Sequence, residues 1–373
     1  MEEFVITYKM GDLFTLEYGK PVIDKECKDG HVPVFGTNGQ IGTSHLAPLC
    51  NHPSVIVGRK GAYRGVHFCD KPFSVIDTAF YVELLNDIVD IKWLYYKLLT
   101  YDINSMDSGS AIPSTDRYQI YSLPIDVPSI NTQKKTVEIL DSINHKIELN
   151  NRINHNLEQQ AQALYKSWFV DFEPFKNGGF VDSELGMIPE GWKLGSLSDI
   201  SSITMGQSPS GTTFNETGEG ILFYQGRTEF GFRYPTVKLF TTEPTRFAEA
   251  NSVLMSVRAP VGDINIAPSK CCIGRGLASI NAKDTEFSFL LYTLKSKEAE
   301  LDLFNGEGTV FGSINRKELE QLPIIIPPQK VINMFNRTVY SLDLEIEKNC
   351  KESKNLQETR DNLLPYLMSG GTI

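Results

Sequence analysis

The segment LDSINHKIELNNRINHNLEQQAQALYKSW, residues 140–168, determines how this chain is built. Apolar residues recur in it at alternating steps of three and four, and asparagines interrupt the pattern in the middle. The segment VYSLDLEIEKNCKESKNLQETRDNLLPYL, residues 339–367, has the same pattern, again apolar at both ends and polar in the middle. This spacing indicates a coiled coil, in which Asn150 and Asn349 occupy matching places and fix the register.

Each segment is longer than a helix that only covers its own domain. About 34 residues at ~1.5 Å per residue give a helix of about 50 Å. We therefore expect the two helices to pair with each other, and a repeat within one chain favours an antiparallel pair. The alternative is two amphipathic helices that each pack only on their own half of the chain. Pro365 is expected to end or kink the second helix near Leu364.

Shorter motifs extend the duplication over the whole chain. Before each long segment lies a region rich in β-branched and aromatic residues and punctuated by glycine, which is typical of strands joined by turns. A repeat of this length predicts two similar domains, each with its own core. The matching motifs are 8–13 with 192–197, 54–56 with 252–254, 109–110 with 308–309, and 123–125 with 322–324.

The sequence thus predicts an α+β fold. Two similar domains of mixed strands and short helices are separated by two long helices, which pair as an antiparallel coiled coil. A stretch rich in proline and glycine after the first helix indicates a linker. The predicted parts are a first domain at 1–128, a first helix at 129–172, a linker at 173–187, a second domain at 188–327 and a second helix at 328–373.

The composition is that of an ordinary globular protein. Of 373 residues, 41% are hydrophobic and 22% charged, and no apolar run approaches the ~20 residues that a membrane helix needs. The start Met1-Glu2-Glu3 is unlike a signal peptide, and six cysteines without regular spacing favour a reducing compartment, so we expect a cytoplasmic protein. A net charge of −10 argues against a surface coated in basic residues, although 30–69 and 264–283 contain no acidic residue.

The sequence carries no motif of a nucleotide-dependent enzyme. Residues 206–213 have the spacing of a phosphate-binding loop, but Thr212 stands where the lysine belongs, so we expect a turn. No GxGxxG sequence follows a predicted strand to hold a dinucleotide or a methyl donor. Asp12, Glu26 and Lys28 imitate the carboxylate set of a nuclease, a combination that also arises by chance. A binding protein is therefore the favoured class.

Two triplets, Cys50-Asn51-His52 and His67-Phe68-Cys69, are mirror images of each other. If each lies on a strand, residues two apart share a face, and the four side chains could meet to hold zinc. The usual Cys-x-x-Cys knuckle is absent, and the second half of the chain has no copy. We therefore favour a structural role for Cys50, His52, His67 and Cys69, and we predict no metal site.

The central part of the chain resembles a known family. The string NNRINHNLEQQAQALYKSWFVDF, residues 150–172, is similar to the conserved central region in one subgroup of the specificity subunits of type I restriction-modification systems. The resemblance covers nearly the whole chain. Weaker matches are VFGTNG at 34–39, GSAIP at 109–113, LPI at 123–125 and QK at 133–134.

The resemblance implies a non-catalytic chain in a larger assembly. The two domains would be target recognition domains, each reading half of a split sequence in double-stranded DNA, and the helices would hold them apart. Two modification subunits would dock on the helices and methylate adenine with S-adenosylmethionine. Restriction motor-nuclease subunits would join them to cleave unmodified DNA with ATP and magnesium. This chain would then bind no cofactor of its own and no membrane.

Recognition domains vary widely in this family, so we predict the DNA contacts from local chemistry. Arginine can bind guanine through two hydrogen bonds, lysine suits phosphate, and amide and hydroxyl groups suit base edges. Glycine-rich turns at 58–65 and 256–262 carry cations, and Arg258 aligns with Arg59 or Lys60, depending on a one-residue shift. The alternative is that these turns, like the loops at 37–40 and 225–228, only reverse the chain. The predicted contacts are Thr37, Asn38, Gln40, Arg59, Lys60, Arg64, Gln225, Arg227, Thr228, Arg258, Lys270 and Arg275.

Two other functions stay open at this point. The first is a stand-alone DNA-modifying or nucleolytic enzyme that uses Asp12, Glu26 and Lys28. The second is a protein-only repeat adaptor in which the coiled coil is the working part. The bases recognised and the spacer between them do not follow from the sequence, because readout depends on loop geometry and DNA shape as well as on residue type.

Overall fold

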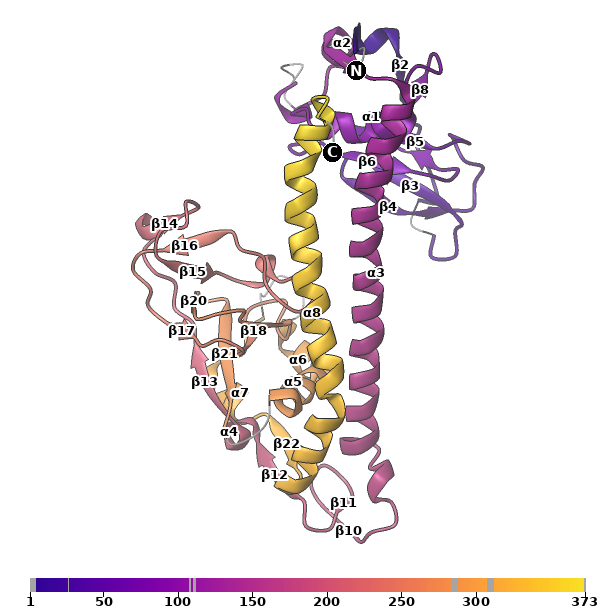
Figure 1. The fold of residues 1–373 in the computed structure, drawn as a ribbon. Coiled ribbons are helices and arrows are strands. Elements are labelled where there is room, and N and C mark those ends of the chain that lie inside the picture. The colour runs from indigo at the N-terminus through magenta and orange to yellow at the C-terminus, as the bar shows by residue number, and fades with distance from the viewer. Residues whose placement is uncertain are drawn as a thin grey trace. The chain divides into compact units, whose positions relative to one another are not determined.

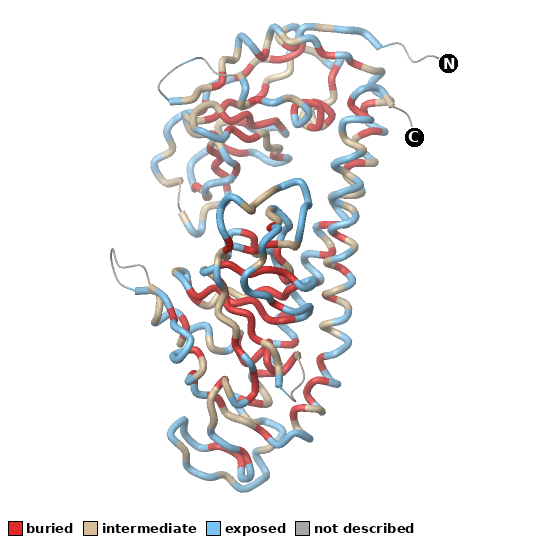
Figure 2. Tube along the Cα trace, turned by 90° about the vertical axis from the view of Figure 1, so that its left-hand side faces the viewer, coloured by how far each residue is buried: buried red, intermediate tan, exposed pale blue. Residues whose placement is uncertain are grey.

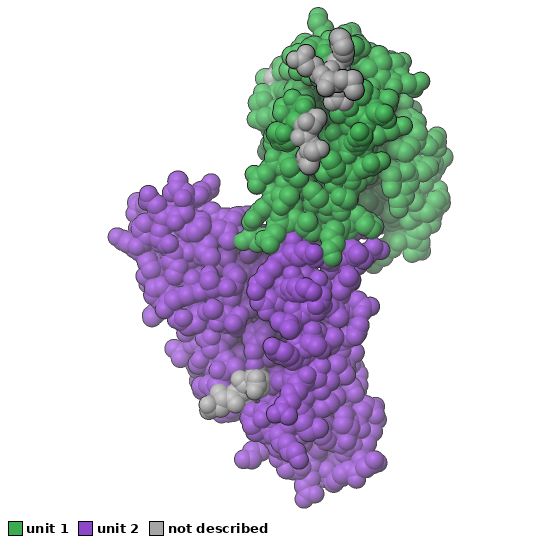
Figure 3. All heavy atoms as spheres, in the orientation of Figure 1, with its two compact units in different colours: residues 1–147, 354–373 green, residues 148–353 purple. Residues whose placement is uncertain are grey.

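The computed structural model describes residues 5–25, 27–106, 109, 112–283, 287–306 and 312–371. The chain divides into two compact units, which are coloured separately in Figure 3. Unit 1 consists of residues 1–147 and 354–373, and unit 2 of residues 148–353. The two long helices, α3 (Ile130–Phe169) and α8 (Gln329–Met368), each contribute one part to each unit. The five-part division expected from the sequence keeps each helix whole and stays a prediction.

Unit 1 is built on two sheets and a separate strand pair (Figure 1). The larger sheet is antiparallel, in the order β2-β8-β5-β6, and the smaller has the order β4-β3-β7, with β3 and β7 parallel. β1 pairs with β9. The bounds are β1 Ile6–Lys9, β2 Phe14–Tyr18, β3 Val32–Gly36, β4 Gly39–Ser44, β5 Ser54–Gly58, β6 Val66–Cys69, β7 Ser74–Val75, β8 Ala79–Leu84 and β9 Pro124–Val127.

The core of unit 1 forms where the larger sheet meets helix α1 (Ile91–Leu98). Strand β5, with the sequence SVIVG, is buried along its whole length, as its β-branched residues predict. Helix α1 begins where Asp90 accepts hydrogen bonds from two backbone amides, and its Trp93 is buried. Figure 2 shows the buried residues gathered in the strands and along one side of the helices. The remaining elements are α2 (Arg117–Ser122), η1 (Met10–Asp12) and η2 (Ile103–Ser105).

Unit 2 contains the same arrangement with more strands. Its antiparallel sheet has the order β13-β21-β18-β19, its mixed sheet has the order β14-β16-β15-β20-β17, and β12 pairs with β22 and β10 with β11. The parallel pair is β15 with β20. The strands are β10 Phe180–Val181, β11 Ile188–Pro189, β12 Lys193–Ser196, β13 Ser201–Met205, β14 Phe214–Asn215, β15 Ile221–Tyr224, β16 Leu239–Thr241, β17 Phe247–Ala248, β18 Val253–Ser256, β19 Ile264–Ile266, β20 Cys271–Ile273, β21 Leu277–Ala282 and β22 Pro323–Ile326. The helices are α4 Leu197–Ile200, α5 Phe287–Ser296, α6 Glu298–Asp302 and α7 Arg316–Glu320, with short 3-10 turns η3 Glu173–Phe175, η4 Gly211–Thr213, η5 Arg227–Glu229 and η6 Leu303–Asn305.

Backbone hydrogen bonds fix which residues of the two units correspond. The Met10 amide donates to the Leu123 carbonyl at 3.0 Å, and the Leu197 amide donates to the Leu322 carbonyl at 2.9 Å. Met10 therefore corresponds to Leu197, and the sequence alignment that placed Leu13 there is wrong by three residues. The two motifs have similar sequences only locally. Which residues of the two units correspond is decided by the strand that each motif pairs with.

A repeated glycine supports the same correspondence. A Cβ atom at Gly19 would lie 2.0 Å from the Ile76 carbonyl oxygen, and one at Gly206 would lie 2.1 Å from that of Gly274. Both positions need glycine, because the returning chain passes too close for any side chain. The motifs at 109–113 and 308–309 fall largely outside the described residues.

The long helices run antiparallel to each other in both units. In unit 2 the Asn349 amide donates to Asn154 Oδ1 at 3.0 Å, and both residues are buried. In unit 1 the Arg360 guanidinium donates to Asn144 Oδ1 at 3.1 Å. Partner numbers fall along one helix as they rise along the other, so the predicted antiparallel pair and α+β fold are confirmed. None of the described helices is long and apolar enough to cross a membrane.

Helix α8 continues to Met368, beyond Pro365. Of the two effects expected of this proline, an end or a kink near Leu364, the end is wrong and the kink stays a prediction. Leu367 and Met368 are buried in the core of unit 1, and Lys97 Nζ donates to the Met368 carbonyl at 2.6 Å. These contacts hold the last turn, where a proline interrupts only one backbone hydrogen bond.

Candidate nucleic-acid interface

In unit 1, three turns that are distant in sequence form one surface. They are the β3–β4 turn, the β5–β6 loop and the turn that leads into β8. Thr37 Oγ1 lies 2.7 Å from each of the carbonyl oxygens of Lys60 and Thr78, so its one hydrogen is shared between them. The Arg59 amide donates to the Thr78 carbonyl at 2.8 Å, and the Gly65 amide to the Thr37 carbonyl at 3.0 Å. The candidate residues of the first two turns are thus brought together by the fold.

Cations line this surface around one tyrosine. The guanidinium of Arg59 lies 4.8 Å from the centre of the Tyr18 ring, and Nη1 donates to the Asp77 carbonyl at 2.9 Å. Lys60 Nζ lies 3.6 Å from Asp77 Oδ2, in a pair that solvent reaches. Arg117 also stacks on Tyr18, at 5.0 Å. The sequence prediction missed Arg117 because only the fold brings helix α2 to these turns.

Not every predicted residue of unit 1 faces solvent. Asn38 and Gln40 are exposed, and Gln40 donates to the Gly42 carbonyl at 3.2 Å. Arg64 is only 2% exposed. Its guanidinium donates to the carbonyls of Gly61 at 3.0 Å and Asn104 at 2.7 Å. Arg64 therefore shapes the β5–β6 loop from inside, and we do not carry it forward as a DNA contact.

Unit 2 presents a comparable surface. The Val257 amide donates to the Gly276 carbonyl at 2.9 Å, which joins the β18–β19 loop to the turn before β21. Arg258 and Arg275 are exposed on these loops, and the exposed Arg227 of the β15–β16 connection forms an ion pair with Asp263 of the β18–β19 loop. Gln225 and Thr228 are exposed as well, and Thr228 Oγ1 donates to Glu229 Oε1 at 2.9 Å.

Lys270 lies apart from this group. It precedes strand β20, whereas Arg275 follows the other end of the same strand. Its ammonium group pairs with Glu249 Oε1 at 3.0 Å and lies 5.0 Å from the centre of the Phe247 ring. The structure therefore brings the predicted contacts of unit 2 together with the exception of Lys270.

The fold also resolves the uncertain alignment of Arg258. Lys60 forms an isolated β-bridge with Ser114, and Arg258 forms one with Ser313. The next bonds agree: the Thr115 amide donates to the Arg59 carbonyl, and the Ile314 amide donates to that of Val257. Arg258 therefore corresponds to Lys60, and the position of Arg59 is occupied in unit 2 by the buried Val257.

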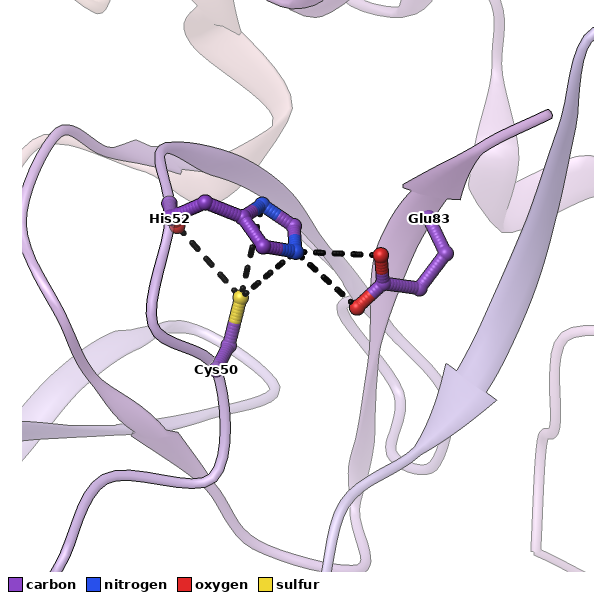
Figure 4. Close-up of side chains that lie close together, drawn as sticks. All are labelled: Cys50, His52 and Glu83. Atoms are coloured by element: carbon purple, nitrogen blue, oxygen red, sulfur yellow. Dashed lines mark hydrogen bonds and ion pairs between the residues drawn. The ribbon is translucent and has the colours of Figure 1, made fainter. Parts of the chain in front are cut away.

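The four side chains considered as possible zinc ligands, Cys50, His52, His67 and Cys69, do not assemble as a set of four. Cys50 Sγ lies 3.7 Å from His52 Nε2, which in turn lies 3.0 Å from a Glu83 carboxylate oxygen (Figure 4). These three are the only group of three or more metal-ligating side chains within the described ranges. Cys69 instead donates to the Lys71 carbonyl. Burial raises the pKa of the Cys50 thiol, which donates to the His52 carbonyl at 3.4 Å. This hydrogen bond and the one between His52 and Glu83 account for the cluster.

The carboxylate set of the nuclease alternative has a structural explanation in part. Asp12 Oδ2 accepts a hydrogen bond from the Lys9 amide at 3.3 Å and caps the turn η1. Asp199 caps the equivalent helix α4 by accepting from the Ser196 amide at 2.7 Å. Because the same cap occurs in both units, helix capping accounts for Asp12 without a catalytic role. Glu26 lies outside the described residues.

A buried ion cluster in unit 2 was not predicted from the sequence. Arg233 is 4% exposed and donates to Asp343 Oδ1 at 2.9 Å and to Glu158 Oε2. Lys295 Nζ lies 2.7 Å from the other oxygen of Glu158. Burial alone would raise the pKa of Glu158, but the charges of Arg233 and Lys295 outweigh it and hold that pKa below its ordinary value. The cluster fastens the β15–β16 connection to both long helices.

Comparisons with known proteins all lead to the same family. The family model for the type I restriction modification DNA specificity domain matches residues 1–159 and 189–353. The "Putative type I restriction enzyme MjaX specificity subunit" of Methanocaldococcus jannaschii is 34% identical over 261 residues, which cover 69% of this chain and 61% of that protein. The HindI specificity subunit of Haemophilus influenzae is 26% identical over 353 residues, covering 74% of each chain. The crystal structure of a type I S subunit from M. genitalium has the same fold, with a TM-score of 0.63 at 16% identity over 98% of this chain and 96% of that one.

Proposed function

The chain belongs to the family of type I restriction-modification specificity proteins, and we propose that it reads a bipartite sequence in double-stranded DNA, one half-site with each domain. One observation carries this proposal. Units 1 and 2 place cations and polar side chains on equivalent turns of the same fold, yet the side chains differ from one unit to the other. Two domains that share one fold but differ in their surface side chains suit the recognition of two different half-sites.

The proposed contact residues are those on or beside these turns whose side chains are exposed or half-buried. Residues that lie on the turns can reach base edges or phosphates, whereas the buried Arg64 and the distant Lys270 cannot serve with them. We keep the remaining predicted residues and add Arg117 for its place on the same surface. The set is Thr37, Asn38, Gln40, Arg59, Lys60, Arg117, Gln225, Arg227, Thr228, Arg258 and Arg275.

The chain carries recognition, and the chemistry belongs to other subunits. In this family S-adenosylmethionine, ATP and magnesium are bound by the modification and restriction subunits. We infer that two modification subunits dock on the α3–α8 pair and that restriction motor-nuclease subunits join them. Their common substrate is double-stranded DNA, so we expect the assembly in the cytoplasm.

Domain exchange tests the proposal directly. Residues 188–327 are replaced by the same region of another family member, and methylated adenines are mapped in cells that express the exchanged chain with its modification subunits. We expect one half-site to change and the other to stay. A change in both half-sites, or in neither, would contradict modular reading.

The same material tests the two other functions. Magnesium-dependent cleavage of DNA by the purified chain alone would favour the stand-alone enzyme. Absence of DNA binding even with the modification subunits present would favour the protein-only adaptor. For the domain exchange, cells that lack the chain serve as the control, because methylation that persists there does not depend on it.

A further inference from the structure

Two cationic positions recur in both units at equivalent places. Lys60 corresponds to Arg258, as the bridges to Ser114 and Ser313 show. Arg117 and Arg316 each open a short helix, directly after the capping residues Asp116 and Asn315. Helices α2 and α7 lead into the equivalent strands β9 and β22, so Arg117 and Arg316 correspond as well. We call these four residues the repeated cations.

The intramolecular partners of the repeated cations are not repeated. Lys60 pairs with Asp77, but the residue equivalent to Asp77 is Arg275, because Gly274 and Gly276 make the backbone bonds that Ile76 and Thr78 make in unit 1. A second cation there cannot form an ion pair with Arg258. The repeated charge therefore has a reason other than that ion pair.

The second repeated pair gives the same result. Arg117 stacks on Tyr18, whose equivalent in unit 2 is Met205. Arg316 pairs with Glu320 at 2.7 Å, whose equivalent in unit 1 is Tyr121. Each unit thus keeps the cation and changes its neighbour. What the two units share is the charge at a fixed place on the fold.

We propose that the repeated cations, Lys60 with Arg258 and Arg117 with Arg316, contact the phosphate backbone, whereas the unrepeated Arg59 reads bases of the first half-site. The inference rests on the proposed function. The two half-sites differ in their bases but share one backbone geometry, so a contact that both domains retain must bind what both half-sites share. Phosphate contacts set the register of a protein on DNA and carry no sequence information, which suits a repeated cation.

The exposure of three of these four side chains agrees with the assignment, whereas Arg117 is half-buried and donates to the Tyr118 hydroxyl. The side chain of Lys60 is 38% exposed and that of Arg316 is 64% exposed, and Arg258 is exposed as well. Arg59 and Arg117 both stack on the Tyr18 ring, but Arg59 also donates to the Asp77 carbonyl and has no cationic equivalent in unit 2, where Val257 takes its place. An oriented guanidinium suits the directional hydrogen bonds that distinguish a guanine.

The test compares Lys60→Gln, Arg258→Gln and Arg59→Gln in the full chain assembled with its modification subunits. Binding to a labelled duplex with the cognate site, and to one without it, is measured by fluorescence anisotropy over a range of salt concentrations. Lys60→Gln and Arg258→Gln should each reduce the slope of log affinity against log salt by about 0.9 and weaken both duplexes equally, by roughly eightfold at 0.1 M salt. The double variant should lose about twice the slope, because the two sites are independent.

Arg59→Gln provides the contrast. It should lower the preference for the cognate first half-site by about tenfold or more and leave the second half-site unchanged. Lys60→Arg and Arg258→Lys should restore the slope, which separates loss of charge from loss of fold. An unchanged slope in both glutamine variants, or a change in base preference caused by them, would overturn the inference. Failure of the bipartite preference in the unaltered chain would instead contradict the proposed function, while the slopes would still test the phosphate contacts.

Discussion

Strands β3 and β4 of unit 1 are joined by a tight turn at Thr37 and Asn38, whereas the equivalent strands of unit 2, β15 and β16, are joined by residues 225–238. The tight turn is held by hydrogen bonds to its neighbouring turns. The longer connection reaches the long helices, where Arg233 is buried against Glu158 and Asp343. Two domains of one fold therefore fasten equivalent loops by different means.

A buried arginine fastens a loop in each unit, but with opposite chemistry. Arg64 donates to neutral carbonyls beside the β5–β6 loop, while Arg233 lies between carboxylates supplied by the helices. The anchor that the units share is elsewhere: Tyr96 donates to Asp141 and Tyr292 to Asp343, both at 2.7 Å. An exchange of residues 188–327 therefore keeps unit 2 stable only if the incoming domain supplies a cation that meets Glu158 and Asp343 on the long helices.

The largest effect is expected from breaking the ion cluster of unit 2. Arg233→Met leaves two buried carboxylates without their shared cation, which should lower the free energy of unfolding of unit 2 by about 3–5 kcal/mol. Hydrogen exchange read by mass spectrometry reports the units separately, with strands β18 and β5 as reference peptides. Lys270→Met, which removes an exposed ion pair, is the control and should cost less than about 1 kcal/mol. Equal losses in the two variants would contradict a special role for Arg233.

Acid should act on the same cluster. The pKa of Glu158 is held below its ordinary value in the folded state, so its contribution to stability is complete above about pH 4.5 and is lost as the pH falls through the folded pKa. Exchange protection in unit 2 should therefore drop on acidification below that pH. Glu158→Gln should lack this component of the pH dependence. A variant that keeps the full acid response would show that other carboxylates cause it.

The sequence predicted the parts of the molecule whose signal is local. The seam of the long helices is one case, because Leu140 and Ile147 in α3, and Val339 and Ile346 in α8, are one heptad apart and all buried. Arg64 shows where such reasoning stops. It stands among glycines and looks solvent-exposed, but the Asn104 carbonyl that binds it lies in a different turn. Arg117 was missed for the same reason, since its neighbour Tyr18 is on another element.

The sequence also could not establish which residues of the two units are equivalent. Arg258 matches Arg59 and Lys60 equally well by spelling, and only the backbone bridges to Ser114 and Ser313 decide for Lys60. Likewise, the ion cluster needs Arg233 to meet residues of both long helices, which no local pattern indicates. Tertiary hydrogen bonds therefore supply the information that local patterns lack.

Lengthening the helices should leave the sequence preference of both domains intact and change only the gap between their half-sites. Seven residues are inserted after Ile147 in α3 and seven after Ser353 in α8, positions that the bond between Asn150 and Ser353 brings close together. One heptad keeps the seam nearly in phase and adds about 10 Å, or about three base pairs. Methylation of a plasmid library with varied spacers should then show both half-sites unchanged and a longer spacer.

An insertion in α8 alone is the control for this experiment. It displaces one half of the seam against the other and should abolish methylation, because polar and apolar positions no longer match. If the double insertion left the preferred spacer unchanged while methylation continued, the helices would not set the gap. The modification subunits would then have to set it.

The smallest effect is expected from making one unit electrostatically like the other. Asp77 pairs with Lys60 in unit 1, while its equivalent in unit 2 is Arg275. Asp77→Arg would release Lys60 and add a charge, so affinity for any DNA sequence should rise by up to about tenfold and the salt dependence should steepen by about one contact. Stability should change little, because the ion pair is exposed. Asp70→Arg is the matched control. It makes the same change of charge at an exposed residue that follows β6, whereas the loop with Lys60 precedes β6, so it should not strengthen binding. Equal gains from both variants would show that net charge, not the place of Lys60 on the fold, governs the contact with DNA.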